Sequence, residues 1–271
     1  MTGVLPILLG RATKVSRVLT RMDKEYVGVL YLHGDFEEDA LREVVREFTG
    51  PIYQRPPVKS AVARELRVRR VKELEVLEVE GRYALIRAVV EAGTYIRKLF
   101  YDIGEVLGVG GSMRELRRVR SGGIQERECV TLQDLVMAFS KLEENDESEV
   151  RRVVRPVEEG LKQVPQIVIK DTAVAAVTYG AALKAPGVVA ISPDIERGSL
   201  VAIFTLKGEL VALGRARLSS DGIREAERGV VADLERVVME RDLYPREWGR
   251  RGSSEEGLDP GRDLYLWPWV D

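Results

Sequence analysis

The sequence predicts an α+β fold, in which a domain of helices packed on a sheet is followed by a small, mostly β module. Tyr83–Val90 reads as a buried strand, and the turn after it leads into a helix with apolar residues on one face. A glycine turn at Gly81-Arg82 separates two alternating strands, as in a hairpin. A second predicted hairpin, across Lys207-Gly208, lies among other short strands in the C-terminal part.

The chain of 271 residues is long enough for two ordinary domains. We expect the first domain at residues 1–160 and the second at residues 165–248. Residues 249–271 are rich in Arg, Gly, Ser and Glu, and we expect them to form a disordered tail. The chain begins like the inside of a domain, because its first ten residues form neither a polar tail nor a capped helix.

The turn that follows Tyr83–Val90 carries an unusual charge. Gly93 marks the turn, and Thr94 is the expected N-cap of the next helix. Arg97 then falls in the first helical turn, where the helix macrodipole disfavours a cation. A local rule broken between a strand and a helix indicates a functional site. The simpler alternative is an Arg that bends into solvent, at a cost of about a few tenths of a kcal/mol.

The other elements follow from apolar periodicity and from capping residues. The predicted helices are Ala12–Arg21, Glu37–Phe48 and Val153–Leu161, with two more capped by Thr131 and Asp171, and the predicted strands are Lys24–Leu32, Leu74–Glu80, Gln166–Ile169, Leu200–Thr205, Leu210–Leu218 and Val230–Val238.

Charge is distributed unevenly although the formal net charge is only −2. From Pro51 to Lys72 there are seven basic residues and one acidic residue, and Arg114–Arg120 holds four arginines in seven residues. From Ser253 to Asp271 the acidic residues outnumber the basic ones by five to one. Basic patches with an acidic tail suit an RNA-binding protein, and a solvated charged face is the alternative.

Composition excludes two classes of site. Cys129 and His33 are the only residues of their types, so neither a disulfide framework nor a Cys/His metal site can be assembled. A Ser-His-Asp or Cys-His mechanism would need His33, which follows a predicted strand and reads as a turn residue rather than a base. Neither a signal peptide nor a membrane span is predicted, so we expect a cytoplasmic protein. An excess of Arg over Lys and a single Asn are typical of a hyperthermophile, and a GC-rich genome would also favour Arg.

A family resemblance emerges when the separate segments are considered together. Six segments, in order over nearly the whole chain, resemble the TruB family of RNA pseudouridine synthases, and in particular its archaeal, dyskerin-like branch. These segments are Thr2-Gly3-Val4-Leu5-Pro6, Lys24-Glu25-Tyr26, Arg55-Pro56-Pro57-Val58-Lys59-Ser60-Ala61, Gly93-Thr94-Tyr95-Ile96-Arg97, Leu116-Arg117-Arg118 and, in a part that looks like a PUA domain, Ile169–Gly180.

The resemblance implies a catalytic domain with a mixed, largely antiparallel sheet and a small PUA barrel. It implies pseudouridine formation in tRNA, at the T-loop uridine, or in rRNA under the direction of a box H/ACA guide RNA. The implied partners are these RNAs and the other proteins of the H/ACA particle, without a cofactor or a metal. The alternative is a non-catalytic RNA-binding protein.

The resemblance also implies roles for single residues. Tyr26 would stack on the flipped uridine and Leu116 would form a wall of the pocket. Tyr95 would pack against the base and is a candidate acceptor for the C5 proton, while Arg97 would orient the catalytic Asp. The implied RNA-binding residues are Lys59, Arg64, Arg67, Arg117, Arg118, Lys170, Tyr179 and Gly180.

Two positions depart from the family pattern. The family's catalytic Asp lies in a Gly-Gly-Thr-Leu-Asp-Pro segment just before the residues matched by Thr2–Pro6, so we expect it upstream of Met1, as if the gene start had been set too late. A genuinely shortened relative is the alternative explanation. Ala63 stands where the archaeal branch usually has Lys, so one RNA or active-site contact is missing from the pattern.

Overall fold

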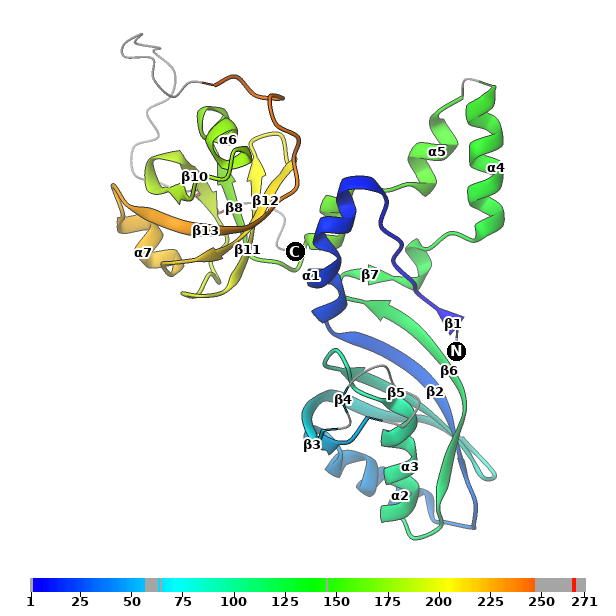
Figure 1. Cartoon of the computed structure of the whole chain (residues 1–271). Helices are drawn as coiled ribbons and strands as arrows, with labels where there is room; N and C mark the ends of the chain where they lie inside the picture. Colours follow the sequence, from blue (N-terminus) through cyan, green and yellow to red (C-terminus); the bar gives the residue numbers. More distant parts are fainter. Residues whose placement is uncertain (1, 57–62, 64, 145, 247–264, 267–271) are drawn as a thin grey trace. The chain divides into compact units, whose positions relative to one another are not determined.

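The computed structural model of the chain describes residues 2–56, 63, 65–144, 146–246 and 265–266. Its contacts divide the chain into two units, Met1–Ile7 with Val18–Val154, and Leu8–Arg17 with Arg155–Asp271. Each unit has its own sheet (Figure 1). Leu8–Arg17 therefore groups with the C-terminal unit, although the sequence analysis assigned it to the first domain. The predicted boundaries at 160, 165 and 248 remain predictions.

A seven-stranded sheet forms the first unit. Its strands are β1 (Thr2–Gly3), β2 (Lys24–Leu32), β3 (Gly50–Gln54), β4 (Arg67–Glu80), β5 (Tyr83–Val90), β6 (Gly111–Ser121) and β7 (Ile124–Gln125). The order is β1-β6-β2-β5-β4-β3, and β7 pairs with β6. Strand β1 runs parallel to β6, whereas the other pairs are antiparallel. The predicted mixed, largely antiparallel sheet and the predicted hairpin between β4 and β5 are confirmed.

Two helices, α2 (Glu38–Glu47) and α3 (Ile96–Val106), pack on one face of this sheet (Figure 1). The apolar face that the sequence predicted for α3 is buried, and its members Ile96, Leu99, Phe100 and Ile103 are at most 4% exposed. Gly28 of β2 makes room for this helix, because a methyl group there would lie 3.0 Å from the ring of Phe100. Burial of the α3 face fixes the position of its first turn over the sheet.

Local details of the first unit differ from the sequence analysis. Helix α3 has Tyr95 as its N-cap, while the hydroxyl of Thr94 donates to the carbonyl of Glu91 within the turn. The predicted helix at Val153–Leu161 is divided into the end of α5 (Ser148–Val153) and a 3-10 turn, η3 (Val157–Leu161). Pro156 lies between them and lacks the N–H that a continuing α-helix requires.

Other short helices complete the described chain before residue 165. The predicted helix at Ala12–Arg21 consists of a 3-10 turn, η1 (Gly10–Val15), followed by α1 (Ser16–Arg21). A second 3-10 turn, η2 (Glu126–Glu128), precedes α4 (Leu132–Glu143). The predicted cap of α4 is confirmed, because the Thr131 hydroxyl accepts from the backbone N–H of Asp134 and the Asp134 carboxylate accepts in return.

The C-terminal unit is mostly β, as predicted. Its strands are β8 (Gln166–Ile169), β9 (Leu183–Lys184), β10 (Val188–Ile191), β11 (Leu200–Thr205), β12 (Leu210–Ala216), β13 (Val230–Val237) and β14 (Tyr265–Leu266), and its helices are α6 (Asp171–Thr178), η4 (Ala185–Gly187) and α7 (Ser220–Glu225). The sheet has the order β14-β10-β8-β11-β12-β13-β9. Lys170, and not Asp171, is the N-cap of α6, and no side chain caps it.

The core of the C-terminal unit is built from a short stretch of sequence. Its buried cluster begins at Ile167 and ends at Met239, with Tyr244 packed against it. Strand β14 falls within the predicted tail and pairs with β10, so these two residues differ from the disorder predicted there, while the rest of 249–271 lies outside the described residues. No helix in the described part of the chain has both the length and the apolar character to cross a membrane.

Candidate functional site

The first turn of α3 is held by a buried amide. Gln54, at the end of β3, is only 2% exposed. Its side-chain oxygen accepts from the backbone N–H of Tyr95 at 2.9 Å, and its side-chain nitrogen donates to the Tyr95 carbonyl at 3.1 Å. These two bonds fix the backbone of a predicted catalytic residue. The sequence analysis missed Gln54, because a single polar residue at the end of a strand carries no pattern.

Arg97 lies exposed in the first turn of α3. Within the described part of the chain, its guanidinium makes no hydrogen bond and no ion pair. The neighbouring Lys98, by contrast, pairs with Asp102 one turn later. Arg97 therefore presents a cation at the helix end that repels it, and nothing described compensates for this charge.

The three residues Lys24-Glu25-Tyr26 have separate structural roles. The ammonium of Lys24 donates to the carbonyls of Leu19, Thr20 and Met22 and thereby satisfies the end of α1. Burial and then the charge of Arg118 lower the pKa of Lys24, which Asp23 partly offsets.

Glu25 points to the sheet face opposite the helices, because side chains alternate along β2. It accepts hydrogen bonds from Arg87 at 2.7 Å and from Arg120 at 2.9 Å. Burial favours a higher pKa for Glu25, but the bonds from the two arginines outweigh it, so the pKa lies below its ordinary value. Arg87 also bonds to Glu73, so the ion pairs join four neighbouring strands, β6, β2, β5 and β4.

Tyr26 and Leu116 lie on the face of the sheet that α3 covers. Tyr26 is opposite Ala88 of β5 and opposite Arg118 of β6, and Leu116 is opposite Gly28. Both side chains belong to the cluster that contains the α3 core residues. The register also pairs Lys24 with Val90, where β5 ends just before the turn into α3. Tyr26 and the start of α3 therefore lie at the same end of the sheet.

The predicted RNA-binding arginines of β6 have intramolecular partners. Arg117 pairs with Glu126 at 2.7 Å, and its side chain is 60% exposed. Arg118 donates from Nε to the carbonyl of Val4 at 2.6 Å, and its own carbonyl accepts from the Val4 N–H. Arg118 thus anchors the chain that leaves β1.

The other predicted RNA-binding positions of the first unit are Arg67, Lys59 and Arg64. Arg67 is half-buried at the start of β4 and approaches the carbonyl of Ala63 at 3.4 Å. Lys59 and Arg64 lie outside the described residues. Arg69, in contrast, reaches the turn before α3, since a methyl group added to Gly93 would lie 3.2 Å from its Nε.

In the C-terminal unit, Tyr179 lies at the C-cap of α6 and Lys170 at the N-cap, so the helix separates the two. The Tyr179 hydroxyl donates to Asp242 at 2.9 Å, and the guanidinium groups of Arg241 and Arg246 lie over its ring. Gly180 follows with a φ of 97°, a conformation that favours glycine.

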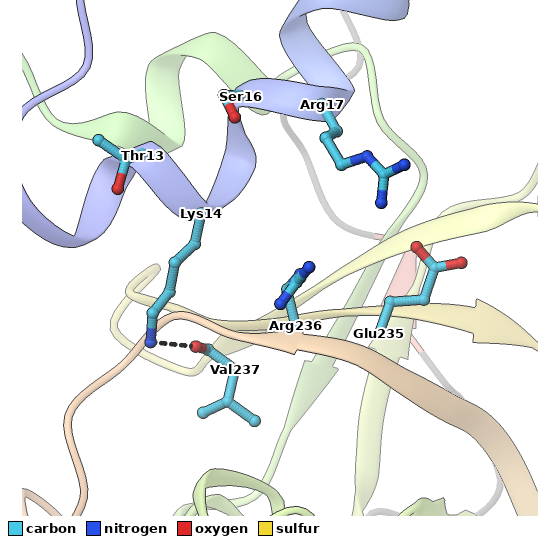
Figure 2. Close-up of a pocket in the computed structure, with 7 residues that line it drawn as sticks. All are labelled: Thr13, Lys14, Ser16, Arg17, Glu235, Arg236 and Val237. Carbon is cyan, nitrogen blue, oxygen red and sulfur yellow. Dashed lines mark hydrogen bonds between the residues drawn. The ribbon is translucent and has the colours of Figure 1, made fainter.

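A basic pocket lies elsewhere in the C-terminal unit, between η1, the start of α1 and the end of β13 (Figure 2). Its volume is about 370 Å³, and its lining residues are Thr13, Lys14, Ser16, Arg17, Glu235, Arg236 and Val237. The sequence analysis missed this pocket, because its two sides are more than two hundred residues apart. Among the described residues, no group of three His, Cys, Asp or Glu side chains could hold a metal ion.

Family models cover almost all of the two units. Residues 1–96 match the TruB family pseudouridylate synthase N-terminal domain, residues 97–162 match the tRNA pseudouridylate synthase B C-terminal domain, and residues 165–238 match the PUA domain. The two pseudouridylate synthase domains and the PUA domain therefore follow one another along the chain in that order.

Similar proteins have the same order at high identity. A probable tRNA pseudouridine synthase B of Korarchaeum cryptofilum is 56% identical over 92% of this chain and 77% of its own length. The corresponding protein of Pyrococcus abyssi is 50% identical over 92% of this chain and 75% of its own length.

Solved structures agree with these sequence matches. A crystal structure of a Cbf5-Nop10-Gar1 complex matches with a TM-score of 0.85 at 50% identity, over 90% of this chain and 75% of that chain. A structure of an H/ACA RNP bound to a substrate RNA containing 2'-deoxyuridine matches with a TM-score of 0.82 at 47% identity. This match covers 89% of this chain and 73% of that chain.

Proposed function

The chain belongs to the TruB family of pseudouridine synthases, and from that premise we propose that its first unit isomerises uridine to pseudouridine in tRNA, in guide-directed rRNA, or in both. The observation that supports this proposal is that Tyr26 and the start of α3 lie at the same end of the sheet, with Leu116 on the same face. We place this activity in the cytoplasm.

The chemistry matches this set of side chains. The bond between N1 of uracil and the ribose breaks, a bond from C5 to the ribose forms, C5 loses a proton and N1 gains one. These steps balance without an oxidant, a nucleotide or a metal. The base must leave its stack, so an aromatic platform is required, for which we propose Tyr26.

Tyr95 and Arg97 supply the polar side of the proposed site. Gln54 holds the Tyr95 backbone, which gives the phenol a defined starting point for accepting the C5 proton. The exposed Arg97 is a cation without a described partner, and we propose that it orients the family's catalytic carboxylate. Arg67, Arg117, Arg118, Lys170, Tyr179 and Gly180 are proposed to bind RNA, together with Lys59 and Arg64.

A second surface supports assembly with a protein partner. Helix α4 exposes four large apolar side chains, of which Leu132 and Val136 are each 70% exposed, Met137 is 65% exposed and Phe139 is 46% exposed. Contiguous exposed apolar surface usually marks a contact with another molecule. The similar structures are titled as complexes with Nop10 and Gar1, and we propose that α4 meets a partner of this kind.

The test is pseudouridine formation on a tRNA transcript, and on an rRNA fragment with a guide RNA and the partner proteins. The chain is assayed as printed and with a Gly-Gly-Thr-Leu-Asp-Pro-containing segment of a relative placed before Thr2. Turnover by the extended chain on either RNA is the expected result. RNA binding without any turnover by either chain would favour the non-catalytic RNA-binding protein instead.

A further inference from the structure

The lining of the basic pocket of the C-terminal unit has more cations than carboxylates. Lys14, Arg17 and Arg236 contribute three cations to its lining, against one carboxylate, Glu235. That carboxylate already accepts a hydrogen bond from Arg215 at 2.6 Å. The pocket therefore keeps a net positive charge inside a concave surface, which concentrates anions.

Hydrogen bonds join the two sides of the pocket. Lys14 donates from Nζ to the Val237 carbonyl at 2.7 Å, as Figure 2 shows, and Arg11 donates to the carbonyls of Val238 and Met239 at 2.6 Å each. These three bonds attach η1 to the end of β13. Val15, which follows Lys14 in η1, is completely buried, so this segment is packed as well as hydrogen-bonded.

Several cations surround Lys14. Loss of water contact and then the positive charges of Arg11, Arg236 and Arg241 lower its pKa below the ordinary value, while Glu240 acts in the opposite direction. Arg236 lies exposed in the pocket and makes no hydrogen bond or ion pair to any residue that the structure describes. A cation in this position is available to an anionic ligand.

We propose that this pocket binds a phosphodiester group of an RNA backbone. The inference rests on the proposed function in taking RNA as the ligand. Three cations suit a phosphate, and the Arg236 guanidinium can donate two parallel hydrogen bonds to its oxygens. The hydroxyl of Ser16 lines the same pocket. The volume of about 370 Å³ accommodates a phosphate with its ribose.

The experiment compares RNA affinity of the full chain with that of Arg236→Glu and Arg236→Gln. The probe is a labelled tRNA transcript, titrated at several salt concentrations. Arg228→Glu is the matched control, because Arg228 is exposed just before the other end of β13. We expect Arg236→Glu to lower the affinity about tenfold and to reduce the slope of log affinity against log salt by about one, while Arg236→Gln loses less.

Equal losses of RNA affinity for Arg236→Glu and Arg228→Glu would show that only the overall charge matters, and would overturn the assignment of the pocket as a phosphodiester site. Titration with inorganic phosphate distinguishes the sources of the anion: phosphate binding that is lost in Arg236→Glu, with unchanged RNA affinity, would identify a free-phosphate site and also overturn it. The catalytic proposal and the pocket proposal can fail independently of each other. If no variant chain forms pseudouridine but Arg236→Glu still weakens RNA binding, the pocket stands and the catalytic proposal falls.

Discussion

The side-chain amide of Gln54 pairs with both backbone polar groups of Tyr95. The Tyr95 carbonyl also accepts from the N–H groups of Lys98 and Leu99 within the helix. The Tyr95 N–H is one of the first groups of the helix and has no acceptor within it, and it donates to the side-chain oxygen of Gln54. The position of β3 is therefore linked to the start of α3.

Replacing Gln54 by Leu should lower the free energy of unfolding by about 1–3 kcal/mol, because both hydrogen bonds between the buried Gln54 amide and the Tyr95 backbone would be lost. Urea denaturation at neutral pH measures this loss. Gln133→Leu on α4 is the matched control, since Gln133 is exposed, and it should change stability very little. Equal stability of the two variants would show that Gln54 does not hold the turn.

Glu25 should make stability depend on pH in the acidic range. Its folded pKa lies below the ordinary value of 4.5, so its contribution is fully present above about 4.5 and is lost as the pH falls through the folded pKa. Glu25→Gln should therefore cost about 2 kcal/mol at neutral pH and progressively less in acid.

Denaturant titrations of the wild type and of Glu25→Gln between neutral and acidic pH measure this difference. Glu78→Gln is a control on the same sheet, at an exposed position of β4. A stability difference for Glu25→Gln that stays constant with pH would contradict the assignment of the depressed pKa to the bonds from Arg87 and Arg120.

Apolar periodicity predicted the scaffold of the site well. The strand Tyr83–Val90 and the buried face of α3 have the predicted bounds or nearly so, because each follows directly from which side chains must leave water. The turn at Gly93 was also predictable, and its φ of 83° is a conformation that glycine adopts readily.

Contacts between residues distant in sequence could not be predicted. The hydrogen bonds from the side chains of Gln54 and Arg118 end on backbone groups of Tyr95 and Val4, and a backbone partner leaves no trace in the sequence pattern. The same holds for the attachment of Leu8–Arg17 to the end of β13, since Arg11 and Lys14 bind carbonyls there. Charge runs identify cations but not their partners, so Arg117 and Arg118 look alike in sequence and differ in structure.

Because Arg117 and Arg118 have different partners, we expect their substitutions to affect stability and RNA affinity differently. Arg117→Gln loses only an exposed pair with Glu126, so stability should change by at most about 1 kcal/mol while RNA affinity falls. Arg118→Gln loses the bond to the Val4 carbonyl and should destabilise the chain by about 1–3 kcal/mol as well. Thermal melts and RNA titrations of both variants measure the two effects, with Arg46→Gln on α2 as an exposed control. A larger stability loss in Arg117→Gln than in Arg118→Gln would contradict this division.

Residues 165–248 should fold alone, because the buried cluster of the C-terminal unit lies between Ile167 and Met239. We expect a cooperative melt of this fragment. A second fragment, with Leu8–Arg17 joined by a flexible Gly/Ser linker, should melt higher, by about 4–8 °C for each kcal/mol contributed by its three hydrogen bonds.

Calorimetry of both fragments tests this expectation. Substituting Arg11 and Lys14 by Ala in the linked fragment should remove the gain, whereas Thr13→Ala should retain most of it, because the Thr13 hydroxyl donates to the carbonyl of Gly10 within η1 itself. A non-cooperative melt of residues 165–248 would count against the predicted boundary at 165.

Arg97 should show opposite effects on stability and turnover. Removing a cation from the first turn of α3 relieves its unfavourable interaction with the helix dipole, so Arg97→Ala should leave the unfolding free energy unchanged or raise it by about 0.3–1 kcal/mol. If Arg97 orients the catalytic carboxylate, the same substitution should lower turnover by about a hundredfold or more, measured on the chain that carries the Asp-containing segment before Thr2.

Lys98→Ala, which breaks the pair with Asp102, is the control from the same helical turn and should lose a little stability but keep its turnover. Equal turnover in Arg97→Ala and Lys98→Ala would show that Arg97 is an ordinary solvent-facing cation.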